Sequence, residues 1–193
     1  MSDIVIRDLC KAFDDKQVLK NFNATFAEGK ITCIMGDSGC GKTTLLNILL
    51  GFLEPDSGSI EGLPSRIGVV FQEDRLCEDF TAVSNIQMVT GKTRTKEQIE
   101  QILERMGLGA ELYHPVRTFS GGMKRRVAIA RALMYDCNLL VLDEAFKGLD
   151  GDTKANILAC TEEYAAGRTV ISVTHDPHEA EVFGDEIIRM EAR

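Results

Sequence analysis

A short glycine-rich segment constrains the fold of this chain more than any other feature. Residues Gly36 to Thr43 read Gly-Asp-Ser-Gly-Cys-Gly-Lys-Thr and match the phosphate loop G-x-x-x-x-G-K-[ST]. An apolar run, Ile31 to Met35, precedes the loop, and a helical pattern, Leu45 to Leu50, follows it. A strand, a loop and a helix in this order bring backbone N–H groups and the positive end of a helix to one phosphate. This context favours a nucleotide site over a glycine-rich turn of no function.

Two side chains of the loop have distinct roles in such a site. The ammonium group of Lys42 is expected to reach the β- and γ-phosphates, and the hydroxyl of Thr43 is expected to ligate Mg²⁺. The expected nucleotide contacts in this segment are Gly36, Asp37, Ser38, Gly39, Cys40, Gly41, Lys42, Thr43 and Thr44.

The composition indicates one α/β domain with no broad nucleic-acid surface. The 193 residues are 44% hydrophobic, which suffices for one sizeable core, and the net charge is −8. Nucleic-acid binding needs clustered positive charge, and the densest cluster, Lys124-Arg125-Arg126, is short. We interpret this cluster as a solvated helix face. A membrane span of ~20 apolar residues and a signal peptide are both absent from the sequence, so we expect a cytosolic protein.

The cysteines indicate neither a metal site nor a disulfide framework. The six are scattered without a C-x-x-C pair, and several lie in apolar runs: Cys10, Cys33, Cys40, Cys77, Cys137 and Cys160. We expect buried free thiols. We expect Cys40, inside the phosphate loop, to be open to oxidation or alkylation.

The order of elements alternates between strands and helices, with a helical stretch in the middle. Short apolar runs over residues 3–35, broken at Asp14-Asp15 and Glu28-Gly29, predict strands, and residues 54–58 predict a turn. Helices are expected over residues 82–89, 96–106, 121–134, 152–166 and from 177 onward. Further strands are expected over residues 66–71, 138–142, 169–174 and 186–190.

One apolar strand ends in two acids. Leu139 to Leu142 is followed by Asp143 and Glu144. A carboxylate at a strand tip beside a phosphate loop is placed to ligate Mg²⁺, which fits Asp143. Glu144, one residue further on, is placed to polarise an attacking water. Two solvated acids in a turn are the alternative, which the preceding apolar strand and the phosphate loop disfavour.

A second anion-binding helix end is indicated by Phe119-Ser120-Gly121-Gly122-Met123. Ser120 is a candidate N-cap, and the two glycines leave the first N–H groups of the helix open to an anion. Since the domain already has a phosphate loop, a second anion site suggests that a second molecule takes part.

With these motifs the chain resembles the ATP-binding subunit of an ATP-binding cassette (ABC) transporter. The resemblance covers nearly the whole chain, and the motifs stand in the family's order: the phosphate loop, Gln72 in the glutamine loop, the Ser120-Gly121-Gly122 signature, Asp143 and Glu144, Leu149-Asp150 in the D-loop, and His175 at the switch. Met123 with the basic residues after it, and the run Val70 to Leu76, are similar to importers of the nitrate, sulfonate and taurine type.

The resemblance implies a fold. It is an α/β protein whose P-loop NTPase core has a mixed sheet, together with an N-terminal antiparallel β subdomain and an inserted helical subdomain. The single domain would span residues 1–193, with the core and β subdomain in residues 1–72 and 136–193. The helical signature subdomain would span residues 73–135.

The resemblance also implies an ATP sandwich between two copies of the chain arranged head to tail. Each ATP would lie on the phosphate loop of one copy and under Ser120, Gly121, Gly122 and Met123 of the other. Phe13 would stack on adenine beside Val18, and Asp150 would link the two sites. The implied catalytic residues are Lys42, Gln72, Glu144 and His175, and the implied Mg²⁺ ligands are Thr43, Gln72 and Asp143.

The implied activity is ATP hydrolysis that powers solute import from the inner face of the cell membrane. The partners would be an integral permease and, indirectly, an extracytoplasmic solute-binding protein. A soluble ABC ATPase acting on nucleic acid or ribosomes is one alternative, which the acidic charge and the single cassette disfavour. An exporter ATPase is a second, and a nucleotide sensor without turnover is a third. The intact set of catalytic groups counts against the sensor.

Some positions depart from the family's usual pattern or have simpler readings. Phe119 and Met123 replace leucine and glutamine, Ala145 replaces proline, and Lys147-Gly148 stands where small residues are usual. None of these changes removes a group that the chemistry needs. Taken alone, Phe13 would be a core aromatic and His175 a hydrogen-bonded histidine at a strand end. His114 and His178 match no motif and are expected at the surface.

Overall fold

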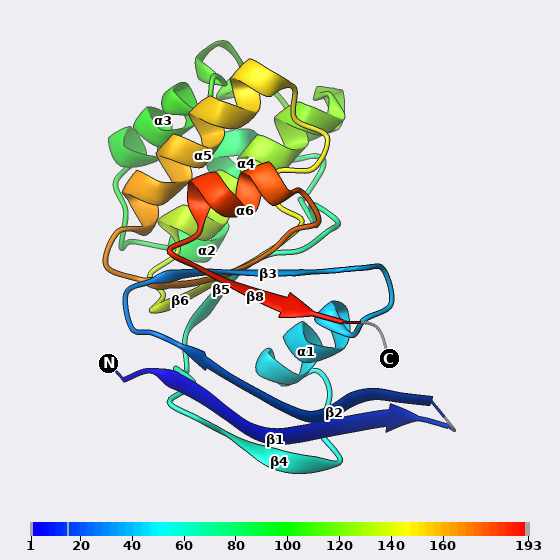
Figure 1. Ribbon diagram of the computed structural model, residues 1–193. Helices are drawn as coiled ribbons and strands as arrows, with labels where there is room; N and C mark the ends of the chain where they lie inside the picture. The colour runs from blue at the N-terminus through cyan, green and yellow to red at the C-terminus, as the bar shows by residue number, and fades with distance from the viewer. Residues whose placement is uncertain (1, 15, 192–193) are drawn as a thin grey trace.

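Two β-sheets with different strand directions organise the protein (Figure 1). The computed structural model describes residues 2–14 and 16–191. The smaller sheet is antiparallel, in the order β2-β1-β4, and consists of β1 (Ile4–Phe13), β2 (Lys16–Phe26) and β4 (Ser57–Glu61). The larger sheet has the order β5-β6-β7-β3-β8, and consists of β3 (Ile31–Gly36), β5 (Ile67–Val70), β6 (Leu139–Asp143), β7 (Thr169–Val173) and β8 (Glu186–Met190).

The described strands of the larger sheet pair in parallel throughout. The expected mixture of parallel and antiparallel strands is therefore divided between two sheets and is not found within the core sheet. The α/β class with a separate antiparallel part is confirmed. Parallel pairing needs long crossovers. The sheet is covered on both faces because its inner strands β3, β6 and β7 are buried on both sides.

The helices lie in two places relative to the larger sheet. Helix α1 (Lys42–Leu49) lies between the two sheets, and the other helices lie on the opposite face of the larger sheet (Figure 1). Those other helices are α2 (Ala82–Thr90), α3 (Lys96–Arg105), α4 (Gly121–Met134), α5 (Gly151–Ala165) and α6 (Pro177–Phe183). Side-chain caps fix all five of these helix starts, at Thr81, Thr95, Ser120, Asp150 and Asp176.

Strand β6 contributes side chains to the hydrophobic cores on both faces of the larger sheet. Leu140 and Leu142 point into the apolar core on the helical side of the sheet, whereas Leu139 and Val141 point into the core around α1. All four side chains are fully buried. A strand with apolar residues at every position suits the centre of a sheet that is covered on both faces.

Most expected elements agree with the structure to within two residues, and one strand was missed. Strand β4 covers Ser57–Glu61, where the sequence predicts the end of a turn. Its residues are exposed except for the half-buried Ile60, so no apolar alternation marks it. The expected break at Asp14-Asp15 lies partly outside the described residues, since Asp15 is not among them. No helix in residues 2–14 and 16–191 is long and apolar enough to cross a membrane.

The cysteines are free thiols, as expected, but Cys40 is not an accessible one. Its side chain is only 4% exposed because it packs into the core around α1. Cys77 is the exposed thiol among the described cysteines. Burial raises the pKa of Cys33 to about 12, so this thiol stays neutral.

Candidate functional site

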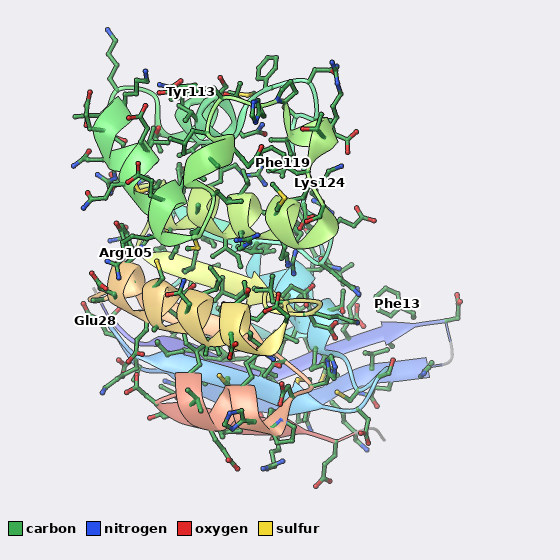
Figure 2. All side chains as sticks on the ribbon, turned by 90° about the horizontal axis from the view of Figure 1, so that it is seen from above. Phe13, Glu28, Arg105, Tyr113, Phe119 and Lys124 are labelled. Atoms are coloured by element: carbon green, nitrogen blue, oxygen red, sulfur yellow. The ribbon has the colours of Figure 1, made fainter. Side chains whose placement is uncertain are left out.

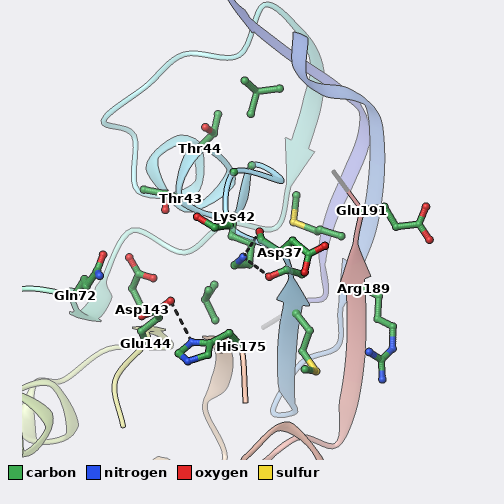
Figure 3. A pocket seen from close by; sticks show the side chains of 18 of the residues that line it. Asp37, Lys42, Thr43, Thr44, Gln72, Asp143, Glu144, His175, Arg189 and Glu191 are labelled. Atoms are coloured by element: carbon green, nitrogen blue, oxygen red, sulfur yellow. Dashed lines mark hydrogen bonds and ion pairs between the residues drawn. The ribbon is translucent and has the colours of Figure 1, made fainter. Parts of the chain in front are cut away.

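A cavity of about 1280 Å³ opens where the phosphate loop meets the carboxyl ends of the parallel strands (Figure 3). Ligands of open α/β sheets bind at this edge. The cavity brings together nearly all the residues that were expected to act on one nucleotide within one chain: Phe13, Val18, Gly36, Asp37, Ser38, Gly39, Gly41, Lys42, Thr43, Thr44, Gln72, Asp143, Glu144 and His175. Cys40 is the expected contact that does not line it.

Two glycines allow the phosphate loop to keep its shape. A Cβ on Gly36 would lie 2.2 Å from the carbonyl oxygen of Met190, so the close approach of β8 excludes any side chain there. Gly41 precedes α1 with φ +103°, in the region that favours glycine. The loop therefore turns directly into α1, and the N-terminus of that helix faces the cavity.

Lys42 lies inside the curve of the loop. Its Nζ donates to the carbonyl oxygens of Gly36, at 2.6 Å, and Asp37, at 2.8 Å. The ammonium group is thus held at the mouth of the loop, on the side that faces Asp143 and Glu144 (Figure 3).

Glu144 has an unusual backbone conformation that is held by a hydrogen bond. Its φ of +47° is unusual for a residue with a side chain, and its N–H donates to the carbonyl oxygen of Val173 at 2.9 Å. Its carboxylate lies between the side chains of His175 and Lys147. Oε1 is 3.4 Å from Nδ1 of His175, and Oε2 is 2.7 Å from Nζ of Lys147.

The two adjacent acids differ in their pKa. Burial, together with the neighbouring Glu144 carboxylate, raises the pKa of Asp143 above its ordinary value. The hydrogen bond from Lys147 lowers the pKa of Glu144 below its ordinary value, and His175 adds to this effect. One site therefore contains a half-buried acid that lacks full charge compensation and a carboxylate whose ionised form is favoured.

Arg125 corrects the interpretation of the basic cluster as a solvated helix face. Its side chain is buried at 6% exposure, and its guanidinium donates to the carbonyl oxygens of Phe71, Ala145 and Glu144 at 2.5–2.7 Å. It also pairs with Asp74 at 3.1 Å. The sequence signal that was available is its place in α4, three and four residues before the buried Ala128 and Ile129 and therefore on the same helix face.

The other end of the cavity is apolar and open. Phe13 ends β1 and is 46% exposed, which excludes the reading of a core aromatic. Val18 contacts the phosphate loop, since a Cβ on Gly41 would lie 3.1 Å from its Cγ1. Sequence reasoning missed Arg189 and Glu191, which also line the cavity. Only the pairing of β8 with β3, which sets Met190 opposite Gly36, places them there.

The signature and the D-loop lie outside this cavity. The side-chain oxygen of Ser120 accepts a hydrogen bond from the N–H of Met123 at 3.3 Å and caps α4, as expected. Among the described residues, apart from its two chain neighbours, no side chain lies within 4 Å of where a Cβ on Gly121 would stand. Figure 2 shows Phe119 and Lys124, which flank the signature, in the helical part and apart from Phe13. Asp150 caps α5 through the N–H of Thr153 at 3.1 Å.

Known proteins resemble this chain in sequence and in fold. The ABC transporter family matches residues 19–147. A taurine import ATP-binding protein of Yersinia pestis is 34% identical over 95% of this chain and 77% of its own length. An aliphatic sulfonates import ATP-binding protein of Pseudomonas syringae is 35% identical over 95% of this chain and 80% of its own length.

A solved structure agrees with these sequence relatives. The dimeric structure of a bacterial ABC transporter cassette superposes with a TM-score of 0.86 at 29% identity, over 98% of this chain and 94% of that one. The chain therefore belongs to the ABC transporter family and is one of its ATPase subunits.

Proposed function

We propose that this chain powers a solute importer and that it acts as an ATP-sandwich dimer bound to a membrane permease. The observation that carries the proposal is the shared cavity, because the phosphate loop, Asp143, Glu144 and His175 all line it. Side chains suited to phosphate binding, metal ligation and water activation thus line one cavity. The two relatives named as importers support the direction of transport.

Binding of ATP follows from the two ends of the cavity. The N–H groups of the loop and the N-terminus of α1 would hold the phosphates, and Lys42 would exchange its carbonyl partners for β- and γ-phosphate oxygens. At the other end, the exposed ring of Phe13 would stack on adenine, with Val18 beside it.

The donor set fits Mg²⁺. This ion takes only one or two carboxylates from a protein when phosphates supply other ligands. The hydroxyl of Thr43, the amide of Gln72 and the carboxylate of Asp143 line the same cavity. Asp143 is half-buried and its pKa is raised, so a neighbouring cation would favour its ionised form. When bound, the ion would neutralise charge on the transferred phosphoryl group.

Hydrolysis needs a base that is ionised and faces the phosphates. Glu144 would accept the proton from the attacking water, since its carboxylate lines the cavity and is kept ionised. His175, 3.4 Å from Glu144, would hold the water and the γ-phosphate in line with that carboxylate. Gln72 would report the state of the site to the permease, because it begins the loop that leads to the helical part.

A second copy of the chain would complete the site. The signature residues Ser120, Gly121, Gly122 and Met123 do not line the cavity of their own chain, yet they form an open helix N-terminus. In a head-to-tail dimer they would cover the γ-phosphate of the partner copy. Asp150 would connect the two sites. The dimeric cassette with the same fold supports this arrangement.

The permease would bind at the loop after Gln72. Cys77 and Phe80 are exposed there, with Phe80 at 47%, and the half-buried Leu76 packs against the core beside them. This surface would hold a short helix of the permease, and the chain would then act at the inner face of the cell membrane. A solute-binding protein would act on the far side of the permease. The solute would be a small organic sulfonate, as the names of the two relatives suggest.

Glu144→Gln tests the assignment of the base. The amide keeps the size of the side chain but cannot take the proton, so we expect ATP hydrolysis to fall at least about 100-fold while ATP binding persists. Phosphate release and binding of a fluorescent ATP analogue measure the two effects. Glu162→Gln, at an exposed position of α5, is the matched control and should hydrolyse ATP at the native rate. Native turnover in Glu144→Gln would show that another group is the base.

Co-purification from native membranes tests the proposed partner. We expect an integral permease to accompany the chain, and taurine or an alkyl sulfonate to stimulate hydrolysis once the complex is in liposomes with a solute-binding protein. Co-purification with RNA or DNA and without a permease would favour the soluble alternative.

A further inference from the structure

Lys147 is the one cavity-lining residue that departs from the family pattern noted in the sequence. It stands with Gly148 where small residues are usual, on the turn between β6 and α5. Its side chain is 55% exposed, so it is free to extend into solvent. It instead forms a short ion pair with a carboxylate of the cavity.

This lysine contacts Glu144 at two points. The backbone N–H of Lys147 donates to the carbonyl oxygen of Glu144 at 3.2 Å, and its Nζ lies 2.7 Å from Oε2 of the same residue. Two further bonds fix the backbone of Glu144, one from its N–H to Val173 and one from Arg125 to its carbonyl oxygen at 2.7 Å. Three hydrogen bonds thus hold the backbone of Glu144.

The side chain of Glu144 has fewer restraints than its backbone. Among the described residues, Lys147 makes the short contact with its carboxylate, whereas Nδ1 of His175 lies 3.4 Å away. Lys42 is engaged with carbonyl oxygens of the phosphate loop. The direction in which the carboxylate points therefore depends mainly on Lys147.

We propose that Lys147 is a positioning residue for Glu144. By holding Oε2, it leaves Oε1 on the side of His175 as the oxygen that meets the attacking water. This inference rests on the proposed role of Glu144 as the base. The glutamate side chain has several rotatable bonds, so its carboxylate can turn away once the bond from Lys147 to Oε2 is lost. A misplaced catalytic group slows the chemical step. Nucleotide binding does not depend on that orientation.

Lys147→Met separates this role from phosphate binding. We expect kcat for hydrolysis of Mg-ATP to fall about tenfold, with KM for Mg-ATP unchanged. Lys147→Arg keeps a cationic donor and should restore most of the lost kcat, whereas Lys147→Gln should not. Lys96→Met is the matched control, since Lys96 is a similarly exposed lysine paired with a glutamate on α3, and it should leave both constants native.

Three results would overturn the inference. An unchanged kcat in Lys147→Met would mean that Glu144 needs no such support, and a raised kcat would mean that the lysine restrains the base. A raised KM with an unchanged kcat would mean that Lys147 binds the nucleotide. The double variant Lys147→Met/Glu144→Gln should have the same kcat as Glu144→Gln alone, because the two residues act in one step.

The failure of this inference differs from the failure of the proposed function. If Glu144→Gln is inactive and Lys147→Met behaves as the native protein, only the positioning role is wrong. If Glu144→Gln hydrolyses ATP at the native rate, the assignment of the base is wrong, whatever Lys147 does.

Discussion

At the scale of single residues, Arg125 connects two loops that the sequence keeps far apart. Its guanidinium donates to carbonyl oxygens of residues 71 and 72, which begin the glutamine loop, and of residues 143–145, which end β6. These carbonyl oxygens lose hydrogen bonds to water on folding, and the guanidinium replaces those bonds. In return, the carbonyl dipoles and Asp74 stabilise the buried positive charge of Arg125. It contributes both to stability and to the placement of Gln72 beside Asp143.

Arg125→Met should destabilise the fold strongly. Removal of the guanidinium leaves several buried carbonyl oxygens and Asp74 without their donor, for which we expect a loss of about 3 kcal/mol. For a chain of this size that loss lowers Tm by roughly 6–12 °C, measured by circular dichroism. Lys124→Met, which removes an ion pair with the exposed Glu78, should cost less than about 1 kcal/mol. Equal melting of the two variants would contradict the role given to Arg125.

At the scale of elements, one lysine joins α5 to α6. Lys154, in the first turn of α5, lies 2.6 Å from Asp176 and 2.8 Å from Glu179. Asp176 caps α6 directly after His175, and Asp150 caps α5 at the D-loop. The ion pairs therefore tie the element that begins at the D-loop to the element that begins at the switch histidine. A shift of one helix would move the other.

Lys154→Met should lower stability in a pH-dependent way. The hydrogen bond from Lys154 lowers the pKa of Asp176 below its ordinary value of 3.8. A lowered pKa means that the pair stabilises the fold above the ordinary value and that this contribution fades as the pH falls through the folded pKa. The variant also leaves Glu179, only 3% exposed, without its cation, which should cost about 3 kcal/mol near neutral pH.

Urea unfolding at several pH values measures this difference. The gap in unfolding free energy between the native protein and Lys154→Met should be largest near pH 7 and should narrow below about pH 4. A gap that stays constant down to pH 3 would show that Asp176 does not contribute in this way.

At the scale of the whole molecule, the two halves of the proposed ATP site lie in different parts of one chain. The phosphate loop leads from β3 of the larger sheet into α1, which lies between the two sheets, whereas the signature begins α4 on the helical side (Figure 1). The cavity has no signature residue in its lining. Two copies are needed if both parts are to contact one nucleotide.

Mixing two inactive variants tests this arrangement. Lys42→Ala should disable the phosphate loop, and Ser120→Arg should block the signature, so each pure protein should be inactive. In an equal mixture, half of the dimers are mixed and each has one complete site, which should restore about a quarter of the native sites. Phosphate release from the mixture measures the recovery. No recovery, with both variants folded and able to dimerise, would contradict a site shared between two copies.

The sequence predicted the motifs and caps that a few adjacent residues define. It did not predict the positions of residues that depend on contacts with distant parts of the chain. The phosphate loop, the acids after β6 and the cap at Ser120 are local signals, because a few adjacent residues define each. The burial of Arg125 depends on carbonyl oxygens from two remote loops, and β4 is an exposed strand with no apolar alternation. The places of Arg189 and Glu191 depend on strand order, which no local pattern contains.

The position of β3 determines when the phosphate loop can fold during synthesis on the ribosome. This strand, whose end starts the phosphate loop, hydrogen-bonds on one side to β7 and on the other to β8, and both of these are synthesised far later. Until Thr169 to Met190 have left the exit tunnel, the nascent phosphate loop lacks both lateral supports. Translation that stalls before those codons should yield a product that cannot retain ATP.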